Sequence, residues 1–174
     1  MKPQISLQSN LQKECETCLE YEVASVLVER NLTISVAESC TGGLVSATLI
    51  NYPGISSVFM EGCVTYSNEA KISRLGVKKE TLDKYGAVSE EIAKEMAEGI
   101  ASNFNTNIGL STTGIAGPQG GSEEKPVGLV YMGICINGKT TVKKFIFSGD
   151  RQSIRLRATK NIINELRLQL KIQA

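Results

Sequence analysis

The sequence has 174 residues, of which 41% are hydrophobic and 21% charged, as is typical of one globular domain. Its 19 basic and 18 acidic residues nearly cancel, which argues against nucleic-acid binding through bulk positive charge. There is no histidine, so serine–histidine and cysteine–histidine catalysis are excluded, and any acid–base chemistry near neutral pH needs another side chain with a shifted pKa.

Residues 1–13 are polar and are expected to form a flexible tail, which leaves residues 14–174 as the single folded domain. Apolar residues at helical spacing predict helices, and short β-branched runs predict strands. In chain order, the first half is predicted to hold a helix over 14–31, a strand over 32–37, a helix over 44–50, a strand over 58–66 and helices over 69–75 and 81–85.

The second half is predicted to hold a helix over 89–103, a strand over 107–113, a glycine-rich loop, strands over 128–136 and 141–147, and a helix over 150–170. Ser89 and Asp150 are the expected N-caps, and Asn137-Gly138 between two apolar runs indicates a hairpin. The alternation of strands and helices predicts an α/β protein, a three-layer α/β/α sandwich with a mixed, mainly parallel five-stranded sheet. Its one antiparallel strand is expected near an edge.

Ligands of such sheets bind beyond the carboxyl ends of the strands. Three of these ends, at 39–43, 66–71 and 113–121, are also the stretches richest in reactive or flexible residues. The site is therefore expected where these three segments meet.

Ser39 lies where a strand turns into a helix, and Thr41, Gly42 and Gly43 follow it. Their backbone N–H groups either hold a phosphate or a developing oxyanion at the positive end of the helix, or simply form a tight turn. Cys40 is a rival nucleophile, because a thiol at a helix N-terminus can have a lowered pKa.

Lys71 falls in the first turn of a helix for which Asn68 is the expected N-cap, a position that disfavours a cation. The helix field and burial would lower the pKa of Lys71 and leave it partly neutral, as a base able to activate a serine. Tyr66 ends the preceding strand, close enough to share a proton network with Lys71. Ser56 precedes the same strand and is either a site residue near Lys71 or a turn hydroxyl.

Two further segments are candidate anion sites. The loop that starts at Thr113 and Gly114 and runs to Gly121 resembles an anion nest or a lid, although it matches neither glycine-rich nucleotide fingerprint. Arg151 begins the last helix and Arg155 lies one turn on, on the same face. The two arginines fit binding of an anionic group, or they belong to a solvated basic helix.

The five cysteines are an odd number without a disulfide framework, and we interpret them as reduced thiols. Cys15-x-x-Cys18 lacks the two further ligands that zinc would need, so no metal site is expected. No stretch approaches the ~20 apolar residues of a membrane span, and the polar start lacks a secretory signal. A cytoplasmic protein is expected.

Six motifs occur in the order in which they occur in the CinA C-terminal family. They are Ala37–Gly43, Val64–Lys71, Gly86–Ser89, Thr113–Pro118, Gly120–Gly128 and Phe147–Arg151. Through them the sequence resembles that family over about residues 14–170, and the fold of the family agrees with the sandwich predicted above. Longer family members carry an additional N-terminal domain resembling molybdopterin-binding proteins. This sequence lacks it, so we expect any activity of that domain to be absent.

The resemblance implies a nicotinamide-nucleotide amidase. It would hydrolyse the carboxamide of nicotinamide mononucleotide to nicotinic acid mononucleotide and ammonia by a serine–lysine mechanism, with no cofactor. Lys71 and Tyr66 match the catalytic lysine and tyrosine of the family, and Ser39 and Ser56 both match serines of its active site. Either serine is a candidate nucleophile. Family members often carry an apolar residue at the position of Cys40, which weakens the thiol hypothesis.

The expected partners are a small nucleotide substrate, whose 5′-phosphate Arg151 and the glycine turns would hold, and other copies of the chain in a homo-oligomer. Neither a nucleic acid nor a membrane is expected as a partner. The alternative is a non-enzymatic CinA-type interaction module linked to competence or DNA recombination. The presence of Ser39, Ser56, Tyr66 and Lys71 speaks against that alternative.

Overall fold

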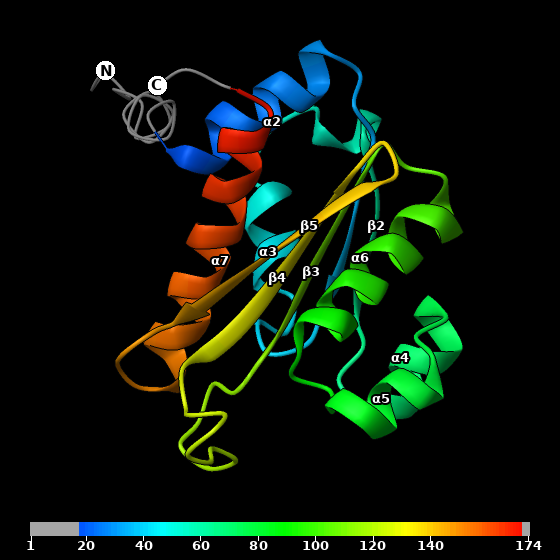
Figure 1. Ribbon diagram of the computed structural model, residues 1–174. Coiled ribbons are helices and arrows are strands. Elements are labelled where there is room, and N and C mark those ends of the chain that lie inside the picture. The colour runs from blue at the N-terminus through cyan, green and yellow to red at the C-terminus, as the bar shows by residue number, and fades with distance from the viewer. Residues whose placement is uncertain (1–17, 172–174) are drawn as a thin grey trace, which may run out of the picture.

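The computed structural model describes residues 18–171, so the predicted tail lies outside the described residues. A single sheet of five strands runs through the molecule, with helices packed on both faces (Figure 1). The strands are β1 (Ile34–Glu38), β2 (Phe59–Val64), β3 (Ile108–Gly114), β4 (Leu129–Ile136) and β5 (Lys139–Ile146). The helices are α2 (Leu19–Glu29), α3 (Leu44–Leu49), α4 (Asn68–Leu75), α5 (Lys79–Tyr85), α6 (Glu90–Phe104) and α7 (Arg151–Gln169), with a 3₁₀ turn η1 at Ile55–Ser57.

The strand order is β2-β1-β3-β4-β5. Strand β1 pairs in parallel with β2 and β3, whereas β4 is antiparallel to both β3 and β5. Four strands therefore run in one direction, and β4, next to the edge, runs against them. This confirms the predicted mixed, mainly parallel five-stranded sheet of an α/β/α sandwich.

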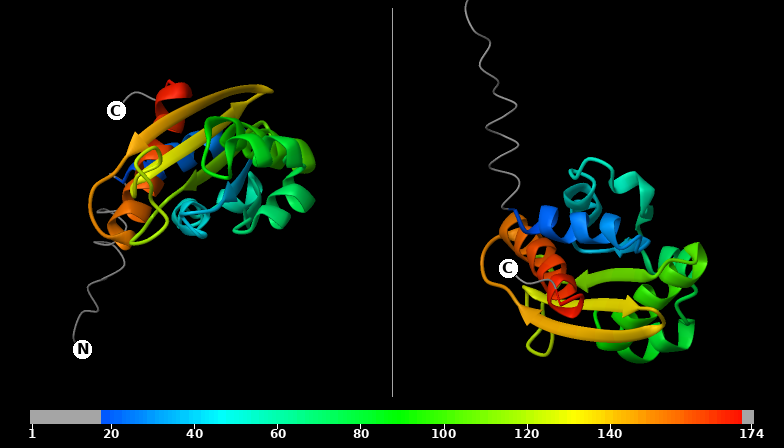
Figure 2. Two further views of the ribbon diagram at one scale, coloured as in Figure 1. Left: turned by 60° about the horizontal axis from the view of Figure 1, so that its bottom comes forward. Right: turned by 90° about the horizontal axis from the view of Figure 1, so that it is seen from above.

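Helices α2, α3 and α7 cover one face of the sheet, and α4, α5 and α6 lie on the other (Figures 1 and 2). The alternation of side chains along β1 distributes its residues between the two layers. Ile34 and Val36 enter the larger core below α2, α3 and α7, while Ala37 packs in the smaller core with α6. The Ser35 hydroxyl donates to the carbonyl of Ile100 on α6. The same alternation sends the last two residues of this segment, Glu38 and Ser39, to opposite faces.

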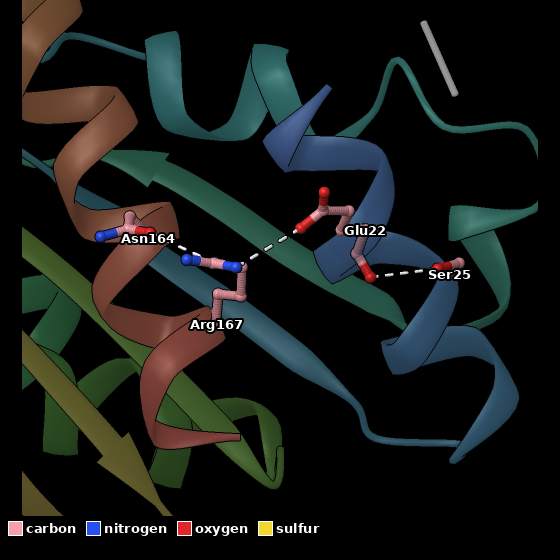
Figure 3. Close-up of polar contacts among 4 residues, drawn as sticks. All are labelled: Glu22, Ser25, Asn164 and Arg167. Carbon is pink, nitrogen blue, oxygen red and sulfur yellow. Dashed lines mark hydrogen bonds and ion pairs between the residues drawn. The ribbon is translucent and has the colours of Figure 1, made fainter. Parts of the chain in front are cut away.

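Helices α2 and α7 are joined at the end of the molecule that is remote from the start of α7. Arg167 lies 3.7 Å from the Glu22 carboxylate and donates to the side chain of Asn164, and the Ser25 hydroxyl donates to the Glu22 carbonyl (Figure 3). Arg167 lies sixteen residues after Arg151 in the helix, about 24 Å along the axis of α7. This ion pair is therefore a structural contact, distant from the carboxyl ends of the strands.

The predicted helix starts were mostly confirmed. Ser89 and Asp150 are the N-caps of α6 and α7, each accepting a backbone N–H three residues on. The prediction of Asn68 as N-cap of α4 is wrong: Ser67 is the cap, and its hydroxyl accepts from the Ala70 N–H. Within residues 18–171, no helix is both long enough and apolar enough to cross a membrane.

Candidate active site

Ser39 and Lys71 meet at the carboxyl end of the sheet. Ser39 follows β1, and Lys71 projects from α4, which begins just after the neighbouring strand β2. Their side chains touch, with Lys71 Nζ 3.2 Å from Ser39 Oγ. Lys71 is only 1% exposed and Ser39 is 9% exposed, so the pair lies at the rim of the core. Of the sequence-predicted reactive residues, these are the two whose side chains the structure brings into direct contact.

Among residues 18–171, no carboxylate forms a hydrogen bond or an ion pair with the Lys71 amine. Its other two partners are the carbonyls of Thr65, at 2.7 Å, and Tyr66, at 3.3 Å. A neutral amine has two N–H bonds and one lone pair, so it can donate to both carbonyls while it accepts from the Ser39 hydroxyl. Burial lowers the pKa of Lys71, because desolvation penalises the ammonium form. Of the two causes that the sequence suggested, burial and the helix field, burial is the one that lowers the pKa of Lys71 here.

The side-chain carboxylate of Glu38, the last residue of β1, lies at the beginning of α3, where the sequence suggested a bound ligand. This buried carboxylate accepts hydrogen bonds from the N–H groups of Gly43, Val45 and Ser46. The Thr41 hydroxyl also donates to Glu38, at 2.6 Å, and Thr41 is fully buried. The Thr41 hydroxyl and the Gly43 N–H, which were expected to bind substrate, donate to Glu38 in this structure. Sequence analysis overlooked Glu38, although an acidic residue that ends a buried strand before a helix was a usable signal.

Cys40 does not have the properties of a nucleophile. Its thiol is 5% exposed and packs in the larger core. Burial raises the pKa of Cys40 to about 12, so the thiol stays protonated near neutral pH. The hypothesis of a thiol activated by a helix N-terminus is not supported.

Tyr66 contacts Lys71 only through its backbone carbonyl. Its side chain is 59% exposed, and its hydroxyl accepts a 2.9 Å hydrogen bond from Arg151. The expected proton network between the Tyr66 hydroxyl and Lys71 is therefore wrong, because Tyr66 lies beyond the end of β2 and its hydroxyl is bonded to Arg151 on α7. Arg151 also donates to the carbonyl of Gly117, which ties the 113–121 loop to the start of α7.

Arg155 lies against the turn that follows Ser39. Its Nε and Nη2 both donate to the carbonyl of Thr41, and a Cβ at Gly42 would lie 3.1 Å from its Nη2. Gly42 has φ +61°, so a glycine suits this position both for its backbone conformation and for the close approach of the arginine. Within residues 18–171, neither Arg151 nor Arg155 forms an ion pair with a carboxylate.

These two arginines line a surface hollow of about 290 Å³, together with Leu44, Gln152 and Leu156. Ser39 and Lys71 are not among its lining residues. The hollow adjoins them through Leu44, which begins α3, and through Arg155 on the Thr41 carbonyl. A cationic hollow thus borders the turn that follows Ser39.

Ser56 is not part of this arrangement. It is exposed in η1, before β2 begins, whereas Lys71 follows the end of β2. Six strand residues separate the two ends, about 20 Å at ~3.3 Å per residue. The expectation that Ser56 lies near Lys71 is wrong, because the two residues flank opposite ends of β2 and the length of the strand separates them.

Thr113 and Gly114 serve packing. The Thr113 hydroxyl donates to the carbonyl of Ala87 and is buried. Gly114 pairs with Val130, and a Cβ there would lie 2.5 Å from the carbonyl oxygen of Leu129. The glycine therefore allows β3 and β4 to approach closely, which is a structural role.

The described part of the chain contains no group of three or more His, Cys, Asp or Glu side chains placed to hold a metal ion. Cys18 lies within the structure, whereas Cys15, the other half of the Cys-x-x-Cys pair, lies outside the described residues.

Comparisons with known proteins agree on one family. A model of the CinA C-terminal domain matches residues 16–170. The chain is 70% identical over 157 residues to a putative competence-damage inducible protein of Clostridioides difficile strain 630, and 64% identical over 164 residues to one of Clostridium perfringens strain 13. These alignments cover 90% and 94% of this chain but only 38% and 40% of the relatives. The chain thus spans about two fifths of the length of the relatives it matches.

Solved structures give the same result. The competence damage-inducible protein A (ComA) of Klebsiella pneumoniae MGH 78578 superimposes with a TM-score of 0.85 at 35% identity, covering 90% of this chain and 97% of that one. The competence/damage inducible protein CihA of Agrobacterium tumefaciens gives a TM-score of 0.83 at 40% identity, with 85% and 91% covered. The chain therefore belongs to the CinA C-terminal domain family.

Proposed function

We propose that this chain is an amidohydrolase that cleaves the carboxamide of nicotinamide mononucleotide, yielding nicotinic acid mononucleotide and ammonia. The observation that carries the proposal is the 3.2 Å contact between Ser39 Oγ and a buried lysine amine that has no carboxylate partner within residues 18–171. A lysine with a lowered pKa is a base that can activate a serine in a chain without histidine.

In the first step, Ser39 Oγ attacks the carboxamide carbon, and neutral Lys71 takes the hydroxyl proton. The tetrahedral intermediate collapses as Lys71 returns that proton to the leaving nitrogen, which departs as ammonia and leaves an ester on Ser39. Water then attacks this ester with Lys71 again as base, and the acid product leaves while Ser39 regains its proton. The reaction uses the side chains of Ser39 and Lys71 and one water molecule.

The turn after Ser39 still offers donors for the oxyanion. Gly42 N–H donates to the Ser39 carbonyl, and Gly43 N–H donates to Glu38. The N–H groups of Cys40 and Thr41 interact with the Cys40 sulfur, which is a weak acceptor, and within residues 18–171 neither donates to a backbone oxygen. We assign these two to the oxyanion, since the residue after an attacking serine commonly supplies such a donor.

The phosphate of the substrate would bind at Arg151 and Arg155. Both guanidinium groups line the hollow that borders the turn after Ser39, and both lack carboxylate partners among the described residues. Their bonds to backbone carbonyls and to the Tyr66 hydroxyl hold them in place and leave further N–H groups for an anion.

The test is to incubate the purified chain with nicotinamide mononucleotide and to follow ammonia and nicotinic acid mononucleotide, with Ser39→Ala as the control. We expect both products in equal amounts from the wild type only. No turnover at high enzyme concentration would refute the substrate assignment. The interaction-module alternative predicts that a Lys71→Ala variant still captures a recombination protein, whereas none of the contacts described above requires such a partner.

A further inference from the structure

Glu38 is a buried carboxylate for which the mechanism above has no role. It is 0% exposed and immediately precedes Ser39. Burying a carboxylate is costly unless its oxygens are well bonded. Here it accepts five hydrogen bonds, from Thr41 Oγ1 (2.6 Å), Gly43 N (2.9 Å), Val45 N (3.0 Å), Ser46 N (2.8 Å) and Ser46 Oγ (2.7 Å).

All five donors lie in residues 41–46, so these hydrogen bonds tie residue 38 to the segment 41–46, and Ser39 lies in the turn between them. The serine backbone is fixed on both sides as well: Ser39 N–H donates to the Thr112 carbonyl, and Gly42 N–H donates to the Ser39 carbonyl. The Thr41 hydroxyl also contacts Thr112 Oγ1, at 2.7 Å, which anchors the turn to β3. Removing the carboxylate would release the turn at its centre.

We propose that Glu38 is a positioning residue for the reaction at Ser39. Its carboxylate holds the turn in the one conformation that keeps Ser39 Oγ within reach of Lys71 Nζ. The inference rests on the proposed serine chemistry, but not on the identity of the substrate.

Glu38 acts through geometry and not through its charge on the base. It lies on the α3 side of β1, whereas the groups that face Lys71 Nζ are Ser39 Oγ and the carbonyls of Thr65 and Tyr66. The titratable neighbour of Lys71 is the Cys40 thiol, whose raised pKa keeps it neutral. Loss of Glu38 should therefore slow the reaction without shifting the pH at which Lys71 titrates.

The test compares wild type with Glu38→Gln. Glutamine has nearly the same shape, but its NH2 group is a donor and would face donors of the 41–46 turn. One readout is the rate at which a fluorophosphonate labels Ser39, followed by intact mass and peptide mapping. The other is kcat and KM for nicotinamide mononucleotide as a function of pH, well below the unfolding temperature. We expect the labelling rate and kcat each to fall by about 100-fold, as for a misplaced reacting group. KM should stay within about threefold, and the acid limb of the pH profile should not move.

Thr48→Ala is the matched control. It also removes a hydroxyl from α3, but this hydroxyl donates to the Leu44 carbonyl and not to Glu38. It should keep wild-type labelling and kcat. A wild-type labelling rate in folded Glu38→Gln would overturn the inference. A shifted acid limb of the kcat–pH profile with an unchanged maximal kcat would also overturn it, because it would indicate an electrostatic role.

If Glu38→Gln fails to fold, Ser46→Ala decides, since it removes one of the five donors and leaves the carboxylate in place. Its labelling should fall by about threefold to tenfold, the effect of a weakened hydrogen bond, and wild-type labelling would refute positioning. If the wild type is labelled at Ser39 but does not turn over nicotinamide mononucleotide, the substrate assignment fails and the comparison of labelling rates still stands. If Ser39 is not labelled at all, both proposals fall.

Discussion

Replacing Lys71 with methionine removes the amine that lies within hydrogen-bonding distance of Ser39 Oγ. A positioned general base contributes about 10²- to 10⁴-fold, so we expect kcat for amide hydrolysis to fall by about 1,000-fold. Methionine is similar in length and apolar, which suits a side chain that is 1% exposed. The assay is ammonia release, with exposed Lys79→Met as the control that should keep wild-type activity.

The same substitution makes a second, independent prediction about stability. Burial lowers the folded-state pKa of Lys71 below its unfolded value of ~10.4. Above ~10.4 the amine is neutral in both states and its burial carries no charge penalty, whereas below the lowered folded pKa the penalty is complete. Between these two values the wild type gains stability with rising pH, by about 1.4 kcal/mol for each unit of pKa shift.

The unfolding free energy of Lys71→Met relative to wild type should therefore decline as pH rises through that window. Urea denaturation at several pH values measures the difference, because contributions from the other groups cancel between the two proteins. A difference that is independent of pH would mean that Lys71 titrates normally in the folded state. In that case the amine is not a base at neutral pH, and the serine–lysine mechanism fails even if the variant is inactive.

The remaining predictions concern the other residues of the site. Ser39→Ala should abolish turnover and Ser56→Ala should leave kcat within about twofold, since kcat reports groups of the chemical step; the opposite result would refute Ser39 as the nucleophile. Cys40→Ala should keep most of its kcat, and iodoacetamide should inactivate the wild type slowly because the thiol stays protonated; rapid inactivation blocked by substrate would contradict this. Arg151→Gln should raise KM for nicotinamide mononucleotide by about 10- to 100-fold, the value of a charge-assisted hydrogen bond, but not KM for the nucleoside that lacks the phosphate. Arg157→Gln, on the same helix but bonded to Ser148, is its control.

The sequence was sufficient for the sheet and for the core of the site. Alternating strand and helix patterns with clear caps at Ser89 and Asp150 gave the layers and the order of elements. The rule that ligands bind beyond the carboxyl ends of strands then placed Ser39 and Lys71 at one edge, where they do touch. These predictions succeeded because periodicity and topology are local properties that tertiary packing seldom reverses.

The errors have a common physical origin. Ser56 lies close to Lys71 in the sequence, but a strand of six residues carries the chain across the whole sheet between them. Tyr66 was expected to end a strand, but it lies two residues beyond the end of β2, where the regular alternation of strand side chains no longer shows to which side its ring points. Glu38 was overlooked because its role appears only once the N–H groups of α3 are seen to converge on it.

That alternation also explains how a buried lysine can coexist with a buried carboxylate so near in the chain. Glu38 and Ser39 are consecutive, so their side chains leave β1 on opposite faces of the sheet. The Glu38 carboxylate accepts hydrogen bonds from donors of the 41–46 turn, whereas the Lys71 amine contacts the Ser39 hydroxyl and two backbone carbonyls. A carboxylate on the lysine side would hold Lys71 as an ammonium and raise its pKa, which would abolish the base. The backbone of one strand therefore separates the carboxylate from the amine, and this separation leaves the neutral amine free to accept a proton from Ser39.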